Sequence, residues 1–353
     1  MSRAGIWRHV PWLGNYDAPQ RVSLGEGDTP LVPLPRWGGA HGLWRVFAKL
    51  EFTNPTGSFK DRGMAVLVTA VRQQGVRRLV EDSSGNAGAS AAAYAARAGL
   101  ACTVFAPAGA PEAKLRQIHA YGAELVAVPG PRAAVADAAR EAGRAPGSYH
   151  IAHNDNPLFV VGNKTFAYEL AEALADLAPR PSPQQAEEEE EGPWHVVVPV
   201  GGGALFCGAW QGFTEWAAAG LLPRARLPRL HAAQAAACAP IVTAWEQGLA
   251  EPAPVVRRPT VCGGIEIERP ARGREILAAV RASAGSAVAS ADDAILAERD
   301  RLARLEGIYA EPTSAAAFAG LADLARRGVV QPDALVVVAV TGSGLKDPGP
   351  VRD

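Results

Sequence analysis

Ten consecutive residues decide how this chain is interpreted: Asn54-Pro55-Thr56-Gly57-Ser58-Phe59-Lys60-Asp61-Arg62-Gly63. They place Lys60 between a Pro/Gly turn and an apolar helical run from Met64 to Val71. A helix start offers backbone N–H groups and a positive dipole end, and a lysine held there partly out of water loses some preference for its charged form. Because only a neutral amine attacks a carbonyl, the pattern indicates a nucleophilic lysine. From this stretch alone, a solvated surface lysine is the alternative.

The length and composition of the chain limit the number of domains and the classes of partner that are expected. The chain has 353 residues, which favours two domains over one, and a hydrophobic content of 48% is enough to bury a core. The 35 basic and 36 acidic residues leave a formal net charge of -1, and no basic block is present. Nucleic-acid binding is therefore not expected.

The cysteines and the N-terminus indicate which stabilising sites and which cellular location to expect. Cys102, Cys207, Cys238 and Cys262 are scattered singly, so neither a disulfide scaffold nor a metal site is predicted. The N-terminus lacks the form of a signal peptide, and no uncharged apolar stretch is long enough to span a bilayer. We therefore expect a cytoplasmic protein without a membrane partner.

Strand and helix patterns alternate after the lysine segment. Strands are predicted at Arg78–Glu81, Ala101–Phe105 and Glu124–Val128, with helices at Ala89–Ala98, Pro111–Tyr121 and Ala133–Arg144. A second alternation ends in the strand Ala334–Val340, after helices near 271–283, 291–305 and 313–327. This order predicts an α/β fold of two domains, each with a mainly parallel twisted sheet flanked by helices.

The predicted domain division places residues 61–150 in a small domain and residues 1–60 plus 151–353 in a large one. In the large domain, a loop over His153–Asn163 is expected to lead into a helix over Lys164–Leu177. Residues 178–193 include the glutamate run 187–191, which repels itself and buries nothing, so this stretch is expected to be an acidic surface loop.

Four polar or glycine-rich loops adjoin the predicted strands. Ligands of open parallel sheets bind beyond the carboxyl ends of strands, so four such loops predict one shared crevice between two domains. The Lys60 loop is one of them, and it is not a P-loop because the earlier glycine of that motif is missing.

The second loop, Ser83-Ser84-Gly85-Asn86-Ala87-Gly88, lies between a strand and a helix. Hydroxyl and N–H groups at a helix start form an anion site, for example for a substrate carboxylate. A plain turn with Ser and Asn as helix caps is the alternative.

The third and fourth loops each follow a strand in the large domain. Val200-Gly201-Gly202-Gly203-Ala204-Leu205 lets a phosphate approach the backbone closely, whereas its fit to a dinucleotide-binding motif is weak. Thr341-Gly342-Ser343-Gly344 offers hydroxyls that can hydrogen-bond a heterocyclic nitrogen. A flexible turn and a terminal turn are the respective alternatives. Together with a nucleophilic lysine and an anion loop, these features describe pyridoxal phosphate chemistry.

In these motifs the chain resembles the fold type II pyridoxal-phosphate enzymes (the tryptophan synthase β family), and within them it is most similar to the threonine synthases. The resemblance runs from about Gly25 to Pro348. It rests on the order of six motifs: Gly25–Leu31, the Lys60 decapeptide, Ser84-Gly85-Asn86, Gly201–Leu205, Glu311–Ala316 and Thr341–Asp347.

The resemblance implies a role for each matching residue. Lys60 would be the Schiff-base lysine and proton shuttle, Asn86 would bond the cofactor's 3′-oxygen, and Thr341 would bond the pyridine nitrogen. The cofactor phosphate would be held by Gly201, Gly202, Gly203, Ala204 and Leu205. The substrate would be bound by Ser83, Ser84, Ala87, Asn154 and Lys164. The small domain would carry the mobile substrate loop, the large domain would bind the cofactor, and the chain would form a homodimer that acts on a small amino acid.

The chain also departs from the threonine synthase pattern. Ser343 stands where those enzymes typically have histidine, Ala87 stands where they have a hydroxyl residue, and the phosphate loop has the all-glycine form of serine/threonine ammonia-lyases. The segment Asn154–Phe159 lacks the basic residue expected for a substrate phosphate, and Lys164 is the nearest cation. Three activities therefore stay open: threonine synthesis, β-elimination or β-replacement on serine or threonine, and ligand binding without catalysis.

Overall fold

The structure is a computed structural model that describes residues 5–177, 194–347 and 349–350. The predicted acidic loop 178–193 lies outside these residues. The chain divides into two compact units. The first comprises Met1–Thr29, Glu51–Asn163 and Gly342–Asp353, and the second comprises Pro30–Leu50 and Lys164–Thr341. The sequence-derived division groups residues 1–29, 51–60, 151–163 and 342–353 with the large domain rather than with residues 61–150, and it stays a prediction.

The first unit is built on a parallel four-stranded sheet in the order β5-β4-β3-β6. Its strands are β3 (Arg78–Glu81), β4 (Ala101–Pro107), β5 (Glu124–Val128) and β6 (Ser148–His150). Leu79 pairs with Cys102, and Val104 pairs with Leu125. Because all four strands run the same way, the loops after β3 and β6 leave the same edge of the sheet.

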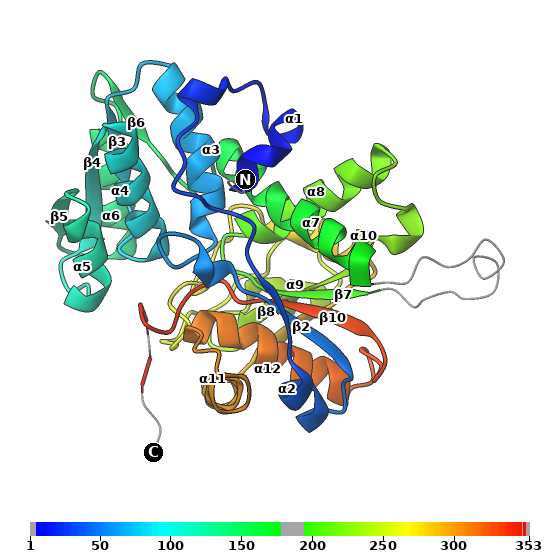
Figure 1. Cartoon of the computed structure of the whole chain (residues 1–353). Coiled ribbons are helices and arrows are strands. Elements are labelled where there is room, and N and C mark those ends of the chain that lie inside the picture. The colour runs from blue at the N-terminus through cyan, green and yellow to red at the C-terminus, as the bar shows by residue number, and fades with distance from the viewer. Residues whose placement is uncertain (1–4, 178–193, 348, 351–353) are drawn as a thin grey trace. The chain divides into compact units, whose positions relative to one another are not determined.

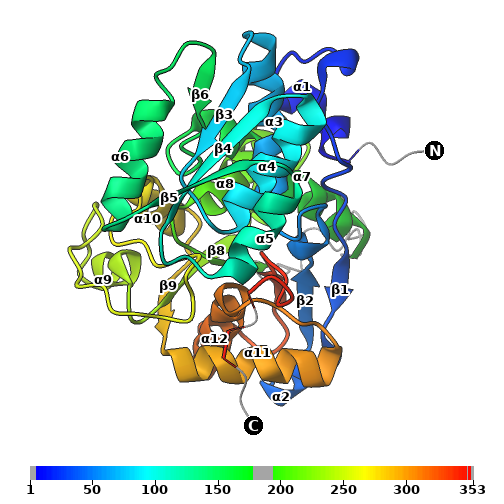
Figure 2. The ribbon, with the colours of Figure 1, turned by 90° about the vertical axis from the view of Figure 1, so that its left-hand side faces the viewer.

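Helices cover both faces of this sheet. They are α3 (Lys60–Gln73), α4 (Asn86–Ala98), α5 (Glu112–Ala120) and α6 (Arg132–Ala142). Figure 2 shows α6 on one face and α3 with α4 on the other. Val80 and Phe105 pack with Val135 and Ala139 of α6 in one core cluster. Side chains alternate along a strand, so Glu81, which follows Val80, faces the α3 and α4 side.

Before the lysine segment, the described part of this unit contains the short helical elements η1 (Gly5–His9), α1 (Val10–Leu13), η2 (Ala18–Gln20) and η3 (Glu51–Thr53).

The second unit is built on a six-stranded sheet in the order β1-β2-β10-β7-β8-β9. Its strands are β1 (Leu31–Pro33), β2 (Arg45–Lys49), β7 (His195–Pro199), β8 (Arg229–Ala235), β9 (Ala287–Ser290) and β10 (Leu335–Ala339). Only β1 is antiparallel to its neighbour. The central strands β7 and β10 are buried along their whole length, as apolar runs covered on both faces require.

Helices also flank this second sheet, with α11 and α12 on one side and α8 and α10 on the other (Figure 1). The helical elements are α2 (Pro35–Ala40), α8 (Ala204–Ala218), η4 (Arg224–Arg226), α9 (Pro240–Glu246), α10 (Gly273–Ala282), α11 (Asp292–Glu306) and α12 (Pro312–Arg326). The predicted fold class, α/β with parallel sheets flanked by helices, is confirmed. Within the described residues, no helix has the length and apolar character needed to cross a membrane.

One boundary prediction was wrong. The loop expected over His153–Asn163 ends early, because α7 spans Pro157–Leu177 and begins seven residues before Lys164. Pro157 suits the first helical position, where its missing N–H costs nothing. The Asn156 side chain accepts the N–H of Leu158 at 3.0 Å and caps the first turn.

Candidate active-site residues

Lys60 is the first residue of α3, and its side chain is half-buried. The ammonium nitrogen lies 4.8 Å from the centroid of the Phe59 ring and 5.7 Å from that of Phe159. Aromatic ring faces attract a cation and shield it from water. The candidate nucleophile therefore lies at a helix start beside two aromatic rings.

The residue after Lys60 anchors the loop that precedes it. Asp61 is fully buried and accepts hydrogen bonds from the backbone N–H of Thr56 at 2.7 Å, from the Thr56 hydroxyl at 2.6 Å and from the Ser90 hydroxyl at 2.6 Å. Burial raises the pKa of Asp61 to about 6, although these hydrogen bonds act in the opposite direction. Because Ser90 belongs to α4, this hydrogen bond ties the start of α3 to α4.

The next residue, Arg62, forms a buried ion pair with Glu51. Its guanidinium donates to both carboxylate oxygens of Glu51, at 2.6 and 2.8 Å, and both side chains have no solvent exposure. The Thr29 hydroxyl and the Asn54 amide also donate to Glu51, at 2.7 and 3.1 Å. A buried charge pair is tolerated only when its remaining hydrogen-bonding groups are satisfied, and here they are.

Glycines let α7 approach the same turn of α3. A Cβ atom at Gly63 would lie 2.6 Å from the carbonyl oxygen of Phe159, and one at Gly162 would lie 2.0 Å from that of Arg62. Only glycine permits so close an approach of two backbones. We call residues 54–63 with these contacts the Lys60 segment.

The predicted anion loop follows β3 and leads into α4. Ser83, Ser84 and Asn86 are half-buried, whereas Ala87 is 2% exposed. A Cβ atom at Gly88 would lie 1.9 Å from the carbonyl oxygen of Ser83, so the loop folds tightly over the first turn of the helix. No side chain caps α4 at Gly85, so the N-terminal N–H groups suit an anion.

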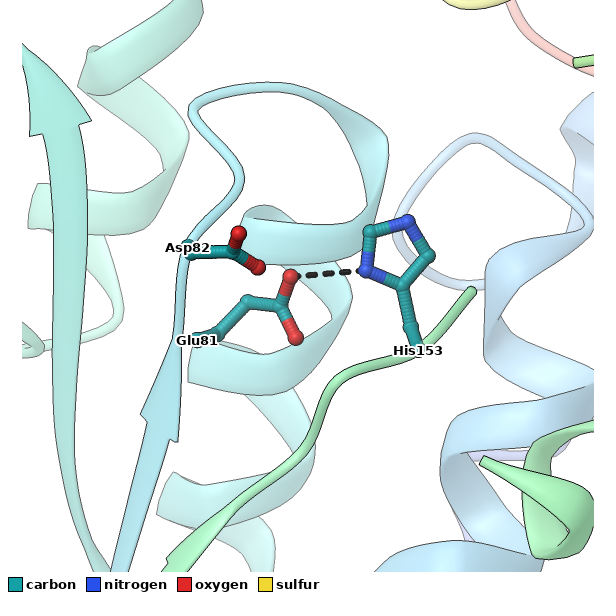
Figure 3. Close-up of side chains that lie close together, drawn as sticks. All are labelled: Glu81, Asp82 and His153. Atoms are coloured by element: carbon teal, nitrogen blue, oxygen red, sulfur yellow. Dashed lines mark hydrogen bonds and ion pairs between the residues drawn. The ribbon is translucent and has the colours of Figure 1, made fainter. Parts of the chain in front are cut away.

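A cluster that sequence reasoning missed lies directly before this loop (Figure 3). Nδ1 of His153 and Oε1 of Glu81 are hydrogen-bonded at 2.7 Å, and both residues are buried. Asp82 is ion-paired with Arg132 at 2.7 Å. Glu81 and His153 are 72 positions apart, and only the parallel pairing of β3 with β6 brings them together. Asn154 follows His153 and is half-buried.

The glycine loop of the second unit joins β7 to α8. Gly203 is the N-cap of α8 with a φ of 92°, and no side chain caps this helix. A Cβ atom at Gly201 would lie 2.9 Å from Cα of Ile265, and one at Gly203 would lie 2.6 Å from Cδ1 of Ile276. Residues 201–205 are all buried. This loop, called the glycine cup below, offers buried backbone N–H groups at a helix start, which is the chemistry that holds a phosphate.

Thr341 follows β10 and is 2% exposed. Strands β10 and β7 are parallel neighbours, so Thr341 and Gly201 lie at the same edge of the second sheet. The hydroxyls of Thr341 and Ser314 are hydrogen-bonded at 2.9 Å, and Thr341 has a weak contact with Glu311 at 3.5 Å. The polar group offered at this position is therefore a hydroxyl rather than a carboxylate.

Lys164 is the one predicted substrate ligand for which the structure shows an ion-pair partner. Its ammonium donates to Glu215 of α8 at 2.8 Å, and the Tyr168 hydroxyl donates to the same carboxylate oxygen at 2.5 Å. The carboxylate therefore neutralises the lysine charge within the second unit. A role in substrate binding stays a prediction.

The predicted site residues divide between the two units. Lys60, Ser83, Ser84, Asn86, Ala87 and Asn154 belong to the first unit, and Lys164, Gly201–Leu205 and Thr341 belong to the second. Within each unit they gather at helix starts and at the carboxyl ends of strands, where parallel sheets bind ligands.

We compared this chain with known protein families and with curated relatives. A family described as pyridoxal-phosphate dependent enzymes matches residues 22–342. A threonine synthase of Mycobacterium leprae is 38% identical over 99% of this chain and 92% of its own length. One from Methanocaldococcus jannaschii is 35% identical over 98% of this chain and 81% of its own.

Solved structures share the fold. A processed threonine deaminase isoform from Solanum lycopersicum has a TM-score of 0.73 and 17% identity, covering 96% of this chain and 84% of that one. An L-serine ammonia-lyase from Rhizomucor miehei has a TM-score of 0.73 and 20% identity, covering 89% and 93%. The predicted fold type II architecture and the predicted cofactor are thereby confirmed. The chain belongs to the family of pyridoxal-phosphate dependent enzymes.

Proposed function

We propose that this chain is a threonine synthase, which converts O-phosphohomoserine and water into threonine and phosphate. One observation carries the proposal: relatives named threonine synthase match 98–99% of the chain at 35% and 38% identity. Identity of this extent covers both units, including the Lys60 segment, the anion loop and the glycine cup.

The residues present fit pyridoxal phosphate. The glycine cup would hold its phosphate, because it places backbone N–H groups at the start of α8. Side chains at Gly201 and Gly203 would collide with neighbouring residues, so this loop conformation requires glycine. Thr341 would face the pyridine nitrogen, Asn86 the 3′-oxygen, and Lys60 would be the Schiff-base lysine. When bound, the cofactor supplies an electron sink for the substrate carbons.

The protein residues would then bind the substrate and move its protons. Ser83, Ser84 and the backbone at Ala87 would hold the substrate carboxylate at the start of α4. Lys60 would take the proton from the substrate α-carbon and return protons later, which requires its amine to be neutral when it acts as a base. The rings of Phe59 and Phe159 limit the access of water to that amine.

The hydroxyl at position 341 favours elimination chemistry. A carboxylate would hold a pyridine nitrogen protonated, whereas a hydroxyl does not, so the ring withdraws electrons less strongly. This suits the loss of a leaving group better than transamination.

A second activity, β-elimination or β-replacement on serine or threonine, is favoured by specific residues. Ala87 replaces the hydroxyl residue of threonine synthases, and the cup has the all-glycine form. The fold is also shared with a threonine deaminase and an L-serine ammonia-lyase. The leaving group therefore separates the two candidates.

A product assay on purified protein with added cofactor tests the proposal. We expect stoichiometric phosphate and threonine from O-phosphohomoserine, and no ammonia from serine or threonine. Ammonia and keto acid from a hydroxy amino acid, without phosphate release, would reject threonine synthesis and support the second candidate. A homodimer and a cytoplasmic location remain predictions, which the sedimentation of the purified protein and cell fractionation would test.

A further inference from the structure

Glu81 and His153 form a buried pair that the proposed reaction does not use. Glu81 has no solvent exposure, and His153 is 6% exposed. Oε1 of Glu81 is bonded to Nδ1 of His153, whereas Oε2 has no hydrogen-bond partner among the described residues. Figure 3 shows this second oxygen turned away from the imidazole. A buried carboxylate with one unsatisfied oxygen is costly, whereas a neutral acid leaves only a carbonyl oxygen unsatisfied.

The pair lies beside the residues proposed to bind the substrate carboxylate. Only Asp82 separates Glu81 from Ser83, and Asp82 is neutralised by Arg132. On the other side, the centroid of the Phe159 ring lies 5.8 Å from that of the His153 ring. The same centroid lies 5.7 Å from the Lys60 ammonium nitrogen. An ionised Glu81 would therefore offset the attraction of the Lys60 ammonium for an incoming carboxylate and would itself repel that carboxylate.

We propose that Glu81 and His153 are a proton-holding pair that keeps Glu81 uncharged, so that the loop after β3 accepts the substrate carboxylate. This proposal rests on the proposed function. Both residues are positioning residues. The protonated Glu81 keeps its proton and donates a hydrogen bond from its O–H to Nδ1 of His153. At high pH this proton leaves to solvent, and the carboxylate repels the substrate.

Charged and titratable groups face the pair from every neighbouring element. They are Asp82 after β3, Cys102 on β4, His150 on β6, Lys60 on α3, Arg132 on α6 and Asp155 before α7. Burial, reinforced by Asp82, raises the pKa of Glu81 to about 8, although His150, Lys60 and Arg132 oppose the shift. Burial and the Lys60 charge lower the pKa of His153 well below its usual range. At neutral pH both members are therefore uncharged.

A metal ion fits this cluster less well. Glu81, Asp82 and His153 do offer ligand atoms within 4.8 Å of one another. However, the Asp82 carboxylate is already paired with Arg132, and Glu81 is bonded to His153. Lys60 and Arg132 also place positive charge around the cluster, which disfavours a further cation.

The pH dependence of KM for O-phosphohomoserine tests the pair. If only the uncharged form binds, the wild-type KM rises about tenfold between pH 7 and pH 9, while kcat at saturation changes much less. Glu81→Gln keeps a neutral group at all pH values and should remove this rise. His153→Asn places an N–H donor beside Oε1, favours the carboxylate, and should move the rise to lower pH. Ionisation of the substrate affects all variants equally.

Glu124→Gln is the matched control, because Glu124 lies on β5 of the same sheet but its side chain is 60% exposed. It should keep the wild-type profile. A Glu81→Gln profile that retains the wild-type rise would overturn the proposal. If the protein turns over a different amino acid, the same comparison is made with that substrate, so failure of the pair and failure of the proposed function remain distinguishable.

A second measurement does not depend on activity. The free energy of unfolding of the full-length protein, saturated with cofactor, is measured in urea from pH 5 to pH 9. Since the pKa of Glu81 is raised on folding, its contribution to stability is lost as pH rises toward about 8. Wild type should therefore lose stability relative to Glu81→Gln over this range. Parallel stability curves would contradict an uncharged Glu81.

Discussion

The Lys60 segment and the glycine cup hold their backbones in opposite ways. The Lys60 segment adds partners: Asp61 accepts three hydrogen bonds, and Arg62 pairs with Glu51 without solvent exposure. The glycine cup removes side chains, because any Cβ at Gly201 or Gly203 would meet Ile265 or Ile276. The Lys60 segment fixes its side chains by contacts, and the glycine cup keeps a backbone free of side chains close to its neighbours.

This difference indicates what each region does chemically. A nucleophilic lysine must keep its place, so its neighbours in sequence are fixed by buried charges. A phosphate is bound by N–H groups, so the cup needs no functional side chain and only needs space. Substitutions should therefore destabilise the two regions in different ways. In the Lys60 segment they leave a buried charge without its partner, and in the glycine cup they introduce a side chain where there is no space.

Removing the Lys60 amine should have the largest effect. Lys60→Ala leaves the buried contacts of Asp61 and Arg62 in place, but it deletes the proposed nucleophile and base. We expect a loss of activity of about 10³-fold or more, measured as phosphate release. Lys114→Ala is the control, because Lys114 is partly exposed and paired with Asp347. Near-wild-type activity of Lys60→Ala would remove Lys60 from the chemistry.

Breaking the ion pair should be the next largest effect. Arg62→Met leaves Glu51 buried without its guanidinium, so we expect a loss of about 3–5 kcal/mol in the free energy of unfolding. Arg78→Met breaks the exposed pair with Glu124 and should cost less than about 1 kcal/mol. Urea unfolding at neutral pH compares the two. Equal costs would mean that burial does not strengthen the Lys60 segment.

Crowding the cup should have a smaller effect on stability. Gly203→Ala introduces a side chain at a φ of 92° and against Ile276, at a cost of about 1–3 kcal/mol. Gly220→Ala is the matched control, because Gly220 has a φ of 75° but no atom within 4 Å of an added Cβ. Only Gly203→Ala should also weaken cofactor affinity, measured by titration of the purified protein. An unchanged affinity would place the phosphate elsewhere.

The smallest expected effect near neutral pH is on stability, and it comes from two histidines on β7, which leads into the cup, and on β8. His195 on β7 and His231 on β8 are hydrogen-bonded at 2.8 Å, and burial lowers their pKa values to about 4 and about 3. Below about pH 6.5 these two histidines bind protons in the unfolded chain but not in the folded one, so their contribution to stability should be constant above that pH and fall as the solution is acidified. Urea unfolding of wild type and of the His195→Gln, His231→Gln double variant from pH 8 to pH 4 isolates this contribution from that of Glu81. A wild type that loses no stability relative to this variant on acidification would contradict the neutral pair.

Regular elements were the most predictable part of the fold. The strands Arg78–Glu81 and Glu124–Val128 were expected at the bounds that the structure gives, because apolar runs between glycine or polar turns have few other interpretations. The start of α7 was missed although Asn156-Pro157 is a helix-start signal. The short helix α2 was also missed, because Pro35-Arg36-Trp37-Gly38-Gly39-Ala40 has no helical composition and is helical only in its packed context.

The site was predictable where chemistry is local in sequence. Lys60, the anion loop and the glycine cup each lie in one short motif, so their residue types could be recognised without a structure. The Glu81–His153 pair could not be found in this way, because its members come from different strand ends. The partners of Asp61 and Arg62 likewise depend on packing: Ser90 and Glu51 carry no sequence signal of these contacts.

The position of the covalent link between cofactor and protein shows directly whether Lys60 is the Schiff-base lysine. The purified protein is saturated with pyridoxal phosphate, reduced with borohydride, digested and examined by peptide mass spectrometry. We expect one modified lysine, Lys60, in the peptide that contains Phe59 and Asp61. Modification of Lys49, Lys114, Lys164 or Lys346 instead, or of no lysine, would contradict it.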